Sequence, residues 1–202
     1  YDFYFKGNRL YFFIGDVSGK GIPASLIMSK TITVFRTMKQ KDSADVADIV
    51  DAINKAVAYN NDNNMFVTLI VGCLDTDTGH IEFCNAGHDP MVLTRHGQEI
   101  ELVPMEVNLP AGVLYDMTFE KNELTLEPGD SLLLYTDGVA EAENRKKELF
   151  TIEHLLEIMK NNPQPTSKDT IAFIESQISL YTSGTEQSDD ITIMCIGYKE
   201  RA

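Results

Sequence analysis

Arg9-Leu-Tyr-Phe-Phe-Ile-Gly-Asp-Val-Ser-Gly-Lys-Gly21 begins as an aromatic and β-branched run and ends as a glycine-rich turn. From Ile22 to Lys39, apolar residues then recur at helical spacing, and Pro23 falls in the first helical turn, where its missing N–H costs nothing. The stretch predicts a strand, a tight turn and a helix. Asp16 should lie at the end of the strand, facing the entrance of the helix.

Helical and strand patterns do not alternate along the rest of the chain. Apolar spacing and capping residues predict further helices at 43–59 (with Ser43 as N-cap), 151–160 and 168–181. Strands separated by turn-forming residues are predicted at 66–74, 81–85, 91–94, 99–103, 117–126, 131–136 and 191–198. Because several strands follow one another without a helix between them, the sequence predicts an α+β fold of two mostly antiparallel sheets flanked by helices.

Three aspartates that are far apart in the sequence each lie where an apolar strand pattern breaks into a turn. They are Asp16, Asp137 in Leu132-Leu-Leu-Tyr-Thr-Asp-Gly138 and Asp189 in Ser188-Asp-Asp-Ile-Thr-Ile193. Three converging carboxylates repel one another unless a cation neutralises them, and oxygen ligands favour Mg²⁺ or Mn²⁺. The backbone carbonyl of Val17 is a further candidate ligand. Taken singly, Asp16 is equally explained as a helix cap, and Asp137 is more simply explained as a turn residue.

Composition limits the function classes. The chain has 202 residues and a net charge of −14, with no basic cluster larger than Arg145-Lys-Lys147, which argues against nucleic acid or an anionic membrane as a partner. A metal-dependent phosphodiesterase acting on nucleic acid is disfavoured for the same reason. No stretch is apolar enough to span a bilayer.

The cysteines offer no sign of chemistry. Cys73, Cys84 and Cys195 all fall inside predicted strands, and their number is odd. They predict buried, reduced thiols in a cytoplasmic protein. A zinc site is disfavoured because the sequence has no Cys-x-x-Cys motif or close Cys/His pair.

Five motifs, in this order, resemble those of the PPM-type (protein phosphatase 2C-like) serine/threonine phosphatases, and above all the stage II sporulation protein E branch that regulates sigma factors. The motifs are Gly15-Asp-Val-Ser-Gly-Lys-Gly21, Asn85-Ala-Gly-His-Asp-Pro90, Leu109-Pro-Ala-Gly-Val113, Tyr135-Thr-Asp-Gly138 and Asp189-Asp-Ile-Thr192. The resemblance implies a four-layer αββα sandwich with two Mn²⁺ or Mg²⁺ ions at one end. It also implies hydrolysis of phosphoserine or phosphothreonine by a metal-activated water. The implied substrate is a regulatory protein of the STAS-domain anti-sigma-factor antagonist class.

The resemblance also assigns roles to individual positions. Asp16 corresponds to the carboxylate that bridges both metals, and Val17 supplies a backbone carbonyl to one of them. Asp137 and Asp189 correspond to the carboxylates of the other metal. Asp190 stands where relatives have Asp or Asn, so it is expected to support the loop rather than bind the ion.

The chain departs from the family pattern at its first residues. Relatives carry a Gly-Gly-Asp upstream of a sequence like Tyr1-Asp-Phe3, and that upstream aspartate helps to hold the second metal. We therefore expect 1–202 to be a single domain truncated at its N-terminal motif, with one well-ligated metal, and to belong to a longer sensor-linked chain. Asp2 is offset from the missing position and is not assigned as a ligand.

The expected longer chain affects where the protein is located in the cell and how it could form oligomers. The resemblance implies a cytoplasmic domain, either free or attached to a membrane-anchored sensor. It leaves open a homodimer formed through an upstream region. This stretch itself is expected to make no direct contact with a membrane.

The proton donor for the leaving group stays open. Ser18 occupies the position at which animal members of the family carry a histidine, and Lys20 and His88 are the alternatives within the motifs. Lys20, Asn85 and His88 are also candidates for substrate binding, although His88 is expected more to fix its own loop than to act as an acid. The competing hypothesis is a regulatory module of the same fold that binds a phosphoprotein with little or no turnover.

Overall fold

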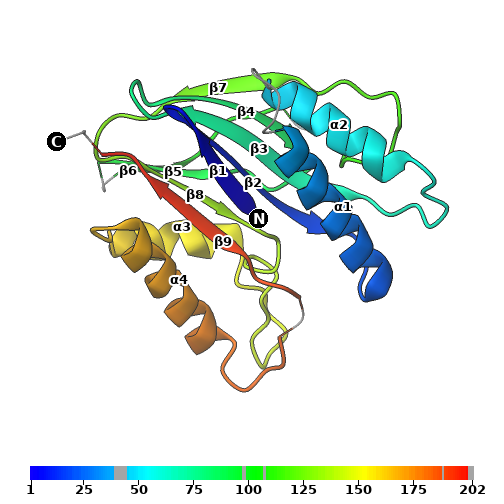
Figure 1. The fold of residues 1–202 in the computed structure, drawn as a ribbon. Coiled ribbons are helices and arrows are strands. Elements are labelled where there is room, and N and C mark those ends of the chain that lie inside the picture. Colours follow the sequence, from blue (N-terminus) through cyan, green and yellow to red (C-terminus); the bar gives the residue numbers. More distant parts are fainter. Residues whose placement is uncertain (39–44, 97–98, 107, 188, 200–202) are drawn as a thin grey trace. The chain divides into compact units, whose positions relative to one another are not determined.

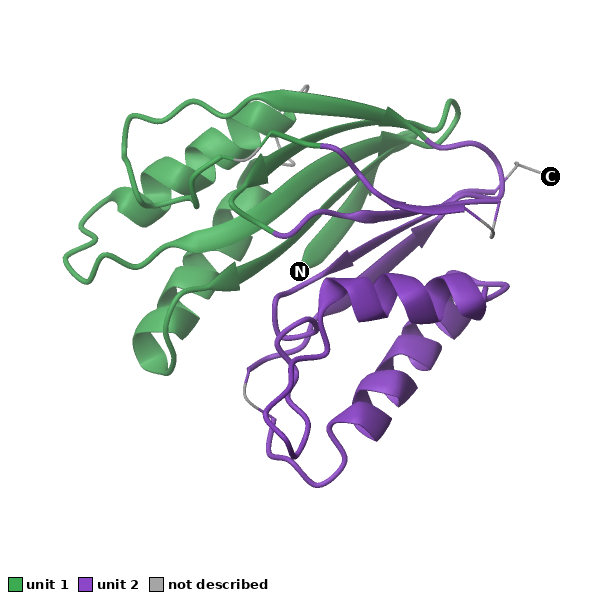
Figure 2. Cartoon of the chain, turned by 180° about the vertical axis from the view of Figure 1, so that it is seen from behind, with its two compact units in different colours: residues 1–88, 105–125 green, residues 89–104, 126–202 purple. Residues whose placement is uncertain are grey.

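The computed structural model describes residues 1–38, 45–96, 99–106, 108–187 and 189–199. The chain divides into two compact units, shown in Figure 2: unit 1 comprises residues 1–88 and 105–125, and unit 2 comprises residues 89–104 and 126–202. Each unit contains one antiparallel sheet and two helices. The predicted α+β class with two antiparallel sheets and four helices is therefore confirmed.

Unit 1 is built on a five-stranded antiparallel sheet with the strand order β1-β2-β3-β4-β7 (Figure 1). Its strands are β1 (Asp2–Lys6), β2 (Arg9–Val17), β3 (Val67–Asp75), β4 (His80–Ala86) and β7 (Lys121–Thr125). Helices α1 (Ile22–Met38) and α2 (Val46–Ala58) lie along one face of this sheet. Phe35 of α1 and Ile53 of α2 are fully buried there in one cluster with Phe13 and Val71 of the strands, and burial of these side chains holds the helices on the sheet.

Unit 2 is built on a four-stranded antiparallel sheet with the strand order β6-β5-β8-β9. Its strands are β5 (Val92–Arg95), β6 (Glu99–Leu102), β8 (Ser131–Tyr135) and β9 (Ile193–Gly197). Helices α3 (Ile152–Asn161) and α4 (Ser167–Tyr181) lie beside this sheet in Figure 1. Leu155 of α3 and Ile174 of α4 share a buried cluster with Leu133 and Tyr135 of β8.

Two details of the predicted elements were wrong. Asp45, not Ser43, caps α2, because its Oδ1 accepts a hydrogen bond from the Ala47 N–H at 2.9 Å; Ser43 itself, like Lys39 at the predicted end of α1, lies outside the described residues. The strand predicted at 117–126 is only Lys121–Thr125. It begins at Lys121, which pairs with Cys84 of β4, and runs to Thr125, which pairs with His80.

Strand β1 was not anticipated. It forms a hairpin with β2 in which Lys6 pairs with Arg9, and the two-residue connection contains Gly7 in the left-handed region at φ 62°. Two-residue hairpin loops favour glycine for this reason. The hairpin places the Asp2 carboxylate beside Arg36 of α1, with an Nε–Oδ2 distance of 2.5 Å.

The cysteines lie on the predicted strands. Cys73 and Cys84 are buried in β3 and β4, Cys195 is half-buried in β9, and all three are free thiols. Burial, with a contribution from the charge of Asp45, raises the pKa of Cys84 to about 12, so this thiol is unreactive at neutral pH. Separately, none of the helices in the described part of the chain has the length and apolarity needed to cross a bilayer.

A buried carboxylate fixes the entry into β8. Asp130 Oδ2 accepts hydrogen bonds from Arg95 Nη1 at 2.6 Å and the Glu127 N–H at 2.9 Å, and Oδ1 accepts one from the His96 N–H at 3.0 Å. Burial opposes ionisation of Asp130, but these bonds outweigh it and hold its pKa below the usual value.

Replacing Asp130 by Asn should therefore destabilise the chain by about 2–3 kcal/mol at pH 7, because Arg95 loses its counter-charge. A carboxyl whose pKa is depressed on folding stabilises the fold above its unfolded pKa of about 3.9 and loses that contribution as the pH falls through the folded value. Urea unfolding of both proteins at pH 7, 4 and 2.5 should show the difference narrowing between pH 4 and pH 2.5, because the folded pKa lies below the unfolded one. An equal difference at all three pH values would contradict this account.

Candidate functional site

In unit 2, Asp137 and Asp189 lie at the same end of a strand pair. Strands β8 and β9 are antiparallel neighbours with Tyr135 opposite Ile193, so the residues that follow β8 and those that precede β9 leave the sheet together. Thr136 links the two segments. Its N–H donates to the Thr192 carbonyl at 3.1 Å and its Oγ1 donates to the Asp190 carbonyl at 3.2 Å, while the Thr192 N–H donates back to Thr136 Oγ1 at 3.0 Å. Both candidate metal-binding carboxylates are therefore carried by one locked pair of loops.

The glycine after Asp137 is required by the closeness of these loops. A Cβ atom at Gly138 would collide with the backbone carbonyl of Asp190. Backbone atoms cannot move aside as the end of a flexible side chain can, so any larger residue would push the Asp137 turn away from the Asp189 segment. The Asp-Gly pair is thus a packing requirement of the site as well as a turn signal.

Two further acidic residues share the electrostatic environment of Asp137. Partial burial and the charge of Asp137 raise the pKa of Asp89. Desolvation, followed by the charges of Asp137, Asp189 and Asp89, raises the pKa of Glu141. This end of unit 2 therefore concentrates negative charge that favours a bound cation.

Asp137 itself is poorly satisfied by the protein. Its Oδ1 atom is buried, and none of the described residues gives it a hydrogen-bond partner. A buried carboxylate oxygen without a donor is costly, and a hard divalent cation would satisfy it. The chemistry of Asp137 and its acidic neighbours thus fits Mg²⁺ or Mn²⁺, although within the described residues no three His, Cys, Asp or Glu side chains are gathered into a ready-made metal cluster.

In unit 1, Asp16 and Val17 are the last two residues of β2, directly before the glycine-rich turn, as predicted. Val17 pairs with Val67 of β3, but Val67 directs its backbone groups elsewhere. Its N–H donates to the Ala111 carbonyl at 2.8 Å, and its carbonyl accepts from the Ala111 N–H at 2.9 Å. The Val67 N–H is therefore committed away from the Val17 carbonyl, which is consistent with the ligand role predicted for that carbonyl.

The acid candidates of the glycine-rich turn differ in their surroundings. Ser18 closes the end of the β2–β3 pair, because its N–H donates to the Phe66 carbonyl at 2.9 Å and its Oγ accepts from the Phe66 N–H at 2.8 Å. This bonding gives Ser18 a structural task. Lys20 is exposed in the same turn, where it can reach a solvent-borne anion.

Asn85 and His88 form a closed turn at the end of β4. Asn85 Oδ1 accepts from the His88 N–H at 2.7 Å, and Asn85 Nδ2 donates to the His88 carbonyl at 2.9 Å. His88 Nδ1 lies 3.0 Å from the hydroxyl of Thr68, the residue opposite Asp16 in the sheet. Both residues are buried, with Asn85 2% and His88 8% exposed, so the described bonds fix the loop; contact with substrate stays a prediction.

Sequence reasoning missed Asp89, Glu141 and Thr136. Asp89 precedes β5, which pairs with β8 so that Val92 lies opposite Leu133, and the residues before β5 therefore run past those after β8. Glu141 is four residues beyond Asp137, and its N–H donates to the Asp137 carbonyl at 2.8 Å. That helical spacing was visible in the sequence, whereas the position of Asp89 depends on the strand pairing.

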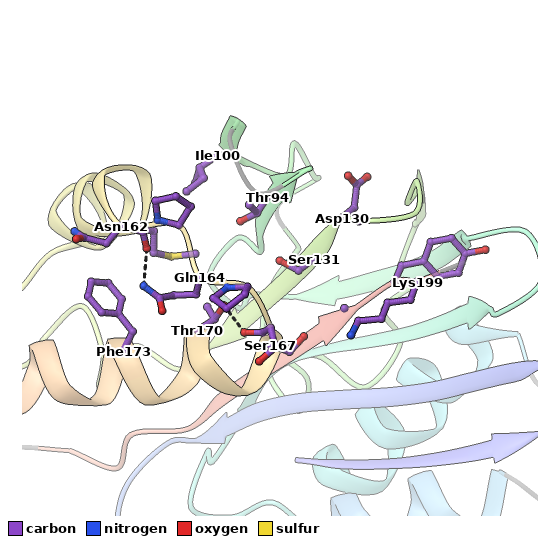
Figure 3. A pocket seen from close by; sticks show the side chains of 17 residues that line it. Thr94, Ile100, Asp130, Ser131, Asn162, Gln164, Ser167, Thr170, Phe173 and Lys199 are labelled. Carbon is purple, nitrogen blue, oxygen red and sulfur yellow. Dashed lines mark hydrogen bonds between the residues drawn. The ribbon is translucent and has the colours of Figure 1, made fainter. Parts of the chain in front are cut away.

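A separate cavity of unit 2, about 120 Å³ in volume, lies at the opposite end of the β8–β9 pair. Figure 3 shows the side chains that line it: Gln164 comes from the connection between α3 and α4, and Ser167 from the start of α4. Ser131 comes from β8, and Lys199 from the segment after β9. Ser131 begins β8, whereas Asp137 follows its end. The cavity is therefore remote from the candidate metal-binding residues of unit 2.

Comparisons with known proteins agree with the motifs. The family described as stage II sporulation protein E (SpoIIE) matches residues 6–199. Protein IcfG of Synechocystis sp. is 28% identical over 224 residues, which cover 97% of this chain and 35% of the relative. Phosphoserine phosphatase RsbU of Bacillus subtilis is 28% identical over 146 residues, which cover 71% of this chain and 43% of the relative. The chain thus spans less than half the length of these relatives.

Solved structures share the fold. The RsbU and RsbW domains of Rv1364c from Mycobacterium tuberculosis superpose with a TM-score of 0.78 at 26% identity, over 96% of this chain and 52% of theirs. RsbX, solved in complex with magnesium, superposes with a TM-score of 0.68 at 17% identity, over 96% of this chain and 83% of its own. The family match extends over nearly the whole sequence, and the chain belongs to the stage II sporulation protein E family of PP2C-like phosphatase domains.

Proposed function

We propose that this chain is a metal-dependent protein serine/threonine phosphatase that hydrolyses phosphoserine or phosphothreonine on a regulatory protein. The observation that carries the proposal is the buried Asp137 Oδ1, which none of the described residues satisfies, at the acidic end of unit 2. Family membership and the phosphoserine phosphatase activity named for RsbU support the same reaction. By family resemblance, the proposed substrate is a phosphorylated STAS-domain antagonist of an anti-sigma factor.

The roles proposed for the metal-binding residues rest on the sequence motifs together with the local geometry of each unit. Asp137 and Asp189 hold one cation through their carboxylates, and Thr136 keeps their two segments together. In unit 1, Asp16 would provide a carboxylate ligand, and Val17 would provide its backbone carbonyl, because the N–H of its partner Val67 is bonded to Ala111 instead. Bound Mg²⁺ or Mn²⁺ supplies the acidification of water and the neutralisation of phosphate charge that such hydrolysis needs.

Other groups of the chain position the Asp137 carboxylate and attract the phosphorylated side chain. The hydrogen bonds of Thr136 with Asp190 and Thr192 hold the Asp137 carboxylate in one place, so little reorganisation is needed when the cation binds. Lys20, exposed in the glycine-rich turn, attracts the phosphorylated side chain. The closed Asn85–His88 turn keeps the neighbouring backbone rigid.

The test compares the chelated chain with the same chain given Mn²⁺ or Mg²⁺, using a phosphoserine protein or peptide and measuring phosphate release. We expect release only with metal. Asp189→Asn should weaken metal binding at least about tenfold by isothermal titration calorimetry. Asp190→Asn is the matched control, because Asp190 is adjacent, equally charged and exposed. A chain that binds metal and phosphoprotein but releases no phosphate would instead be a regulatory binding module.

A further inference from the structure

A cavity of about 410 Å³ opens beside the candidate metal-binding loops of unit 2. It is bounded by the turn after β8, by one face of the C-terminal half of α4 and by the segment that leads to Asp189. Gly138, the neighbour of Asp137, is part of its wall. Gln187 also lines the cavity, and its Nε2 donates to the Asp189 carbonyl at 2.7 Å. The cavity is thus continuous with the segments that carry both carboxylates.

The charged residues that line this cavity are all acidic. They are Glu143, Glu175 and Glu186, and among the described residues that line the cavity there is no lysine or arginine. Glu143 is paired with Lys147, at an Nζ–Oε2 distance of 2.6 Å. In the part of the chain that the structure describes, no ion pair involves Glu175 or Glu186.

A second cation, Arg145, lies beside Gly184, the residue before Thr185 of the cavity wall. Its Nε donates to the Ser183 carbonyl at 2.9 Å. Its guanidinium is therefore held on backbone at the edge of the cavity. The acidic wall keeps a net negative charge, next to the further negative charges of Asp137, Glu141 and Asp189.

The rest of the wall combines apolar side chains with uncharged polar ones, namely Ser179, Thr182, Thr185 and Gln187. Ala142, Ile178 and Ile191 supply carbon surface. Thr185 Oγ1 is buried in the same wall, and no described residue gives it a hydrogen-bond partner. Carbon surface, carboxylates at the rim and an unused hydroxyl together match a long side chain with an aliphatic stem and a cationic head, as in arginine or lysine.

We propose that this cavity binds a basic side chain of the phosphoprotein substrate, within three residues of the phosphorylated serine or threonine. The proposal rests on the proposed phosphatase function and names the substrate class for that site. A phosphate approaching the acidic end of unit 2 meets repulsion wherever the cation does not screen it. A neighbouring positive side chain seated against Glu175 and Glu186 offsets that repulsion and orients the substrate.

The test uses matched phosphoserine peptides, each with one arginine at one of the three positions on either side, or with citrulline, the uncharged isostere, at the same place. With Mn²⁺, we expect kcat/KM to be about tenfold higher for the best arginine peptide than for its citrulline partner. The double variant Glu175→Gln/Glu186→Gln should lose most of that preference. Glu157→Gln, an exposed substitution on α3, should keep it. The preference should also shrink with added salt.

p-Nitrophenyl phosphate has no flanking residue, so its hydrolysis tests the phosphatase function separately from the role of the cavity. If the chain with Mn²⁺ hydrolyses neither this ester nor any peptide, the phosphatase function fails. Turnover of the ester without an arginine preference at any of the six positions overturns the role of the cavity alone. A double variant that loses ester turnover as strongly as peptide turnover, while folding normally by circular dichroism, also overturns it, because the glutamates would then act on the metal site.

Discussion

Replacing Asp137 by Asn is expected to lower kcat for phosphate release at least about 100-fold while making the metal-free chain more stable. The loss follows because the variant removes a proposed charged metal ligand, and such a ligand is worth several kcal/mol in a metal-assisted reaction. The gain follows because Asp137 Oδ1 is buried without a donor among the described residues. A neutral carboxamide is cheaper to bury than a carboxylate, and it no longer repels Asp89 and Glu141.

Thermal unfolding with EDTA and with Mn²⁺ measures both effects. The metal-free variant should gain about 0.5–1 kcal/mol over the unmodified chain. Added Mn²⁺ should raise the unfolding temperature of the unmodified chain and of Asp190→Asn, but raise that of Asp137→Asn little. A metal-free variant less stable than the unmodified chain would show that the carboxylate is paired within the protein, and would remove the argument for a cation at this position.

Replacing Asn54 by Ala should cause a large loss of stability, about 3 kcal/mol, without touching the proposed chemistry. Asn54 is fully buried on α2. Its Nδ2 donates to the carbonyls of Leu114 and Tyr115 at 2.9 and 3.1 Å, and its Oδ1 accepts from the Gly112 N–H at 2.7 Å. Alanine leaves the buried Gly112 N–H without this partner, which is costly, and also removes the bonds to the carbonyls of Leu114 and Tyr115.

Urea unfolding of Asn54→Ala beside Asn63→Ala isolates this effect. Asn63 is exposed in the polar segment after α2, so its replacement should change the free energy of unfolding by less than about 0.5 kcal/mol. A loss below about 1 kcal/mol for Asn54→Ala would mean that water replaces the lost bonds and that the 112–115 segment is not anchored through this side chain.

The elements that sequence reasoning identified well are those with long apolar patterns. Helix α1 and strand β2 come from one uninterrupted pattern, and the structure reproduces them within two residues of their predicted ends. Strand β1 was not predicted, and its pairing with β2 depends on the hairpin at Gly7. The cap of α2 was misplaced because Ser43 and Asp45 are equally good caps in sequence, and the choice depends on where the helix begins.

The residues of the candidate site also differ in how far the sequence predicts them. Motifs mark Asp137 and Asp189, and the pairing of β8 with β9 explains why residues so far apart in sequence leave one sheet at one end. Asp89 needed the pairing of β5 with β8, which no local pattern reveals. The hydrogen bonds made by the Thr136 hydroxyl could not be predicted from the sequence either, because threonine in a predicted strand normally indicates only β-propensity.

The hydrogen bonds of Thr136 have an evolutionary consequence. The segment between Asp137 and Asp189 includes α3, α4 and most of the acidic cavity wall. The backbone at its two ends is held together by the hydrogen bonds of Thr136. Substitutions in the part of that segment that faces the cavity leave the hydrogen bonds of Thr136 intact, so the carboxylates of Asp137 and Asp189 keep their positions. The proposed substrate-binding cavity can thus change its lining while the proposed metal-binding carboxylates keep their positions.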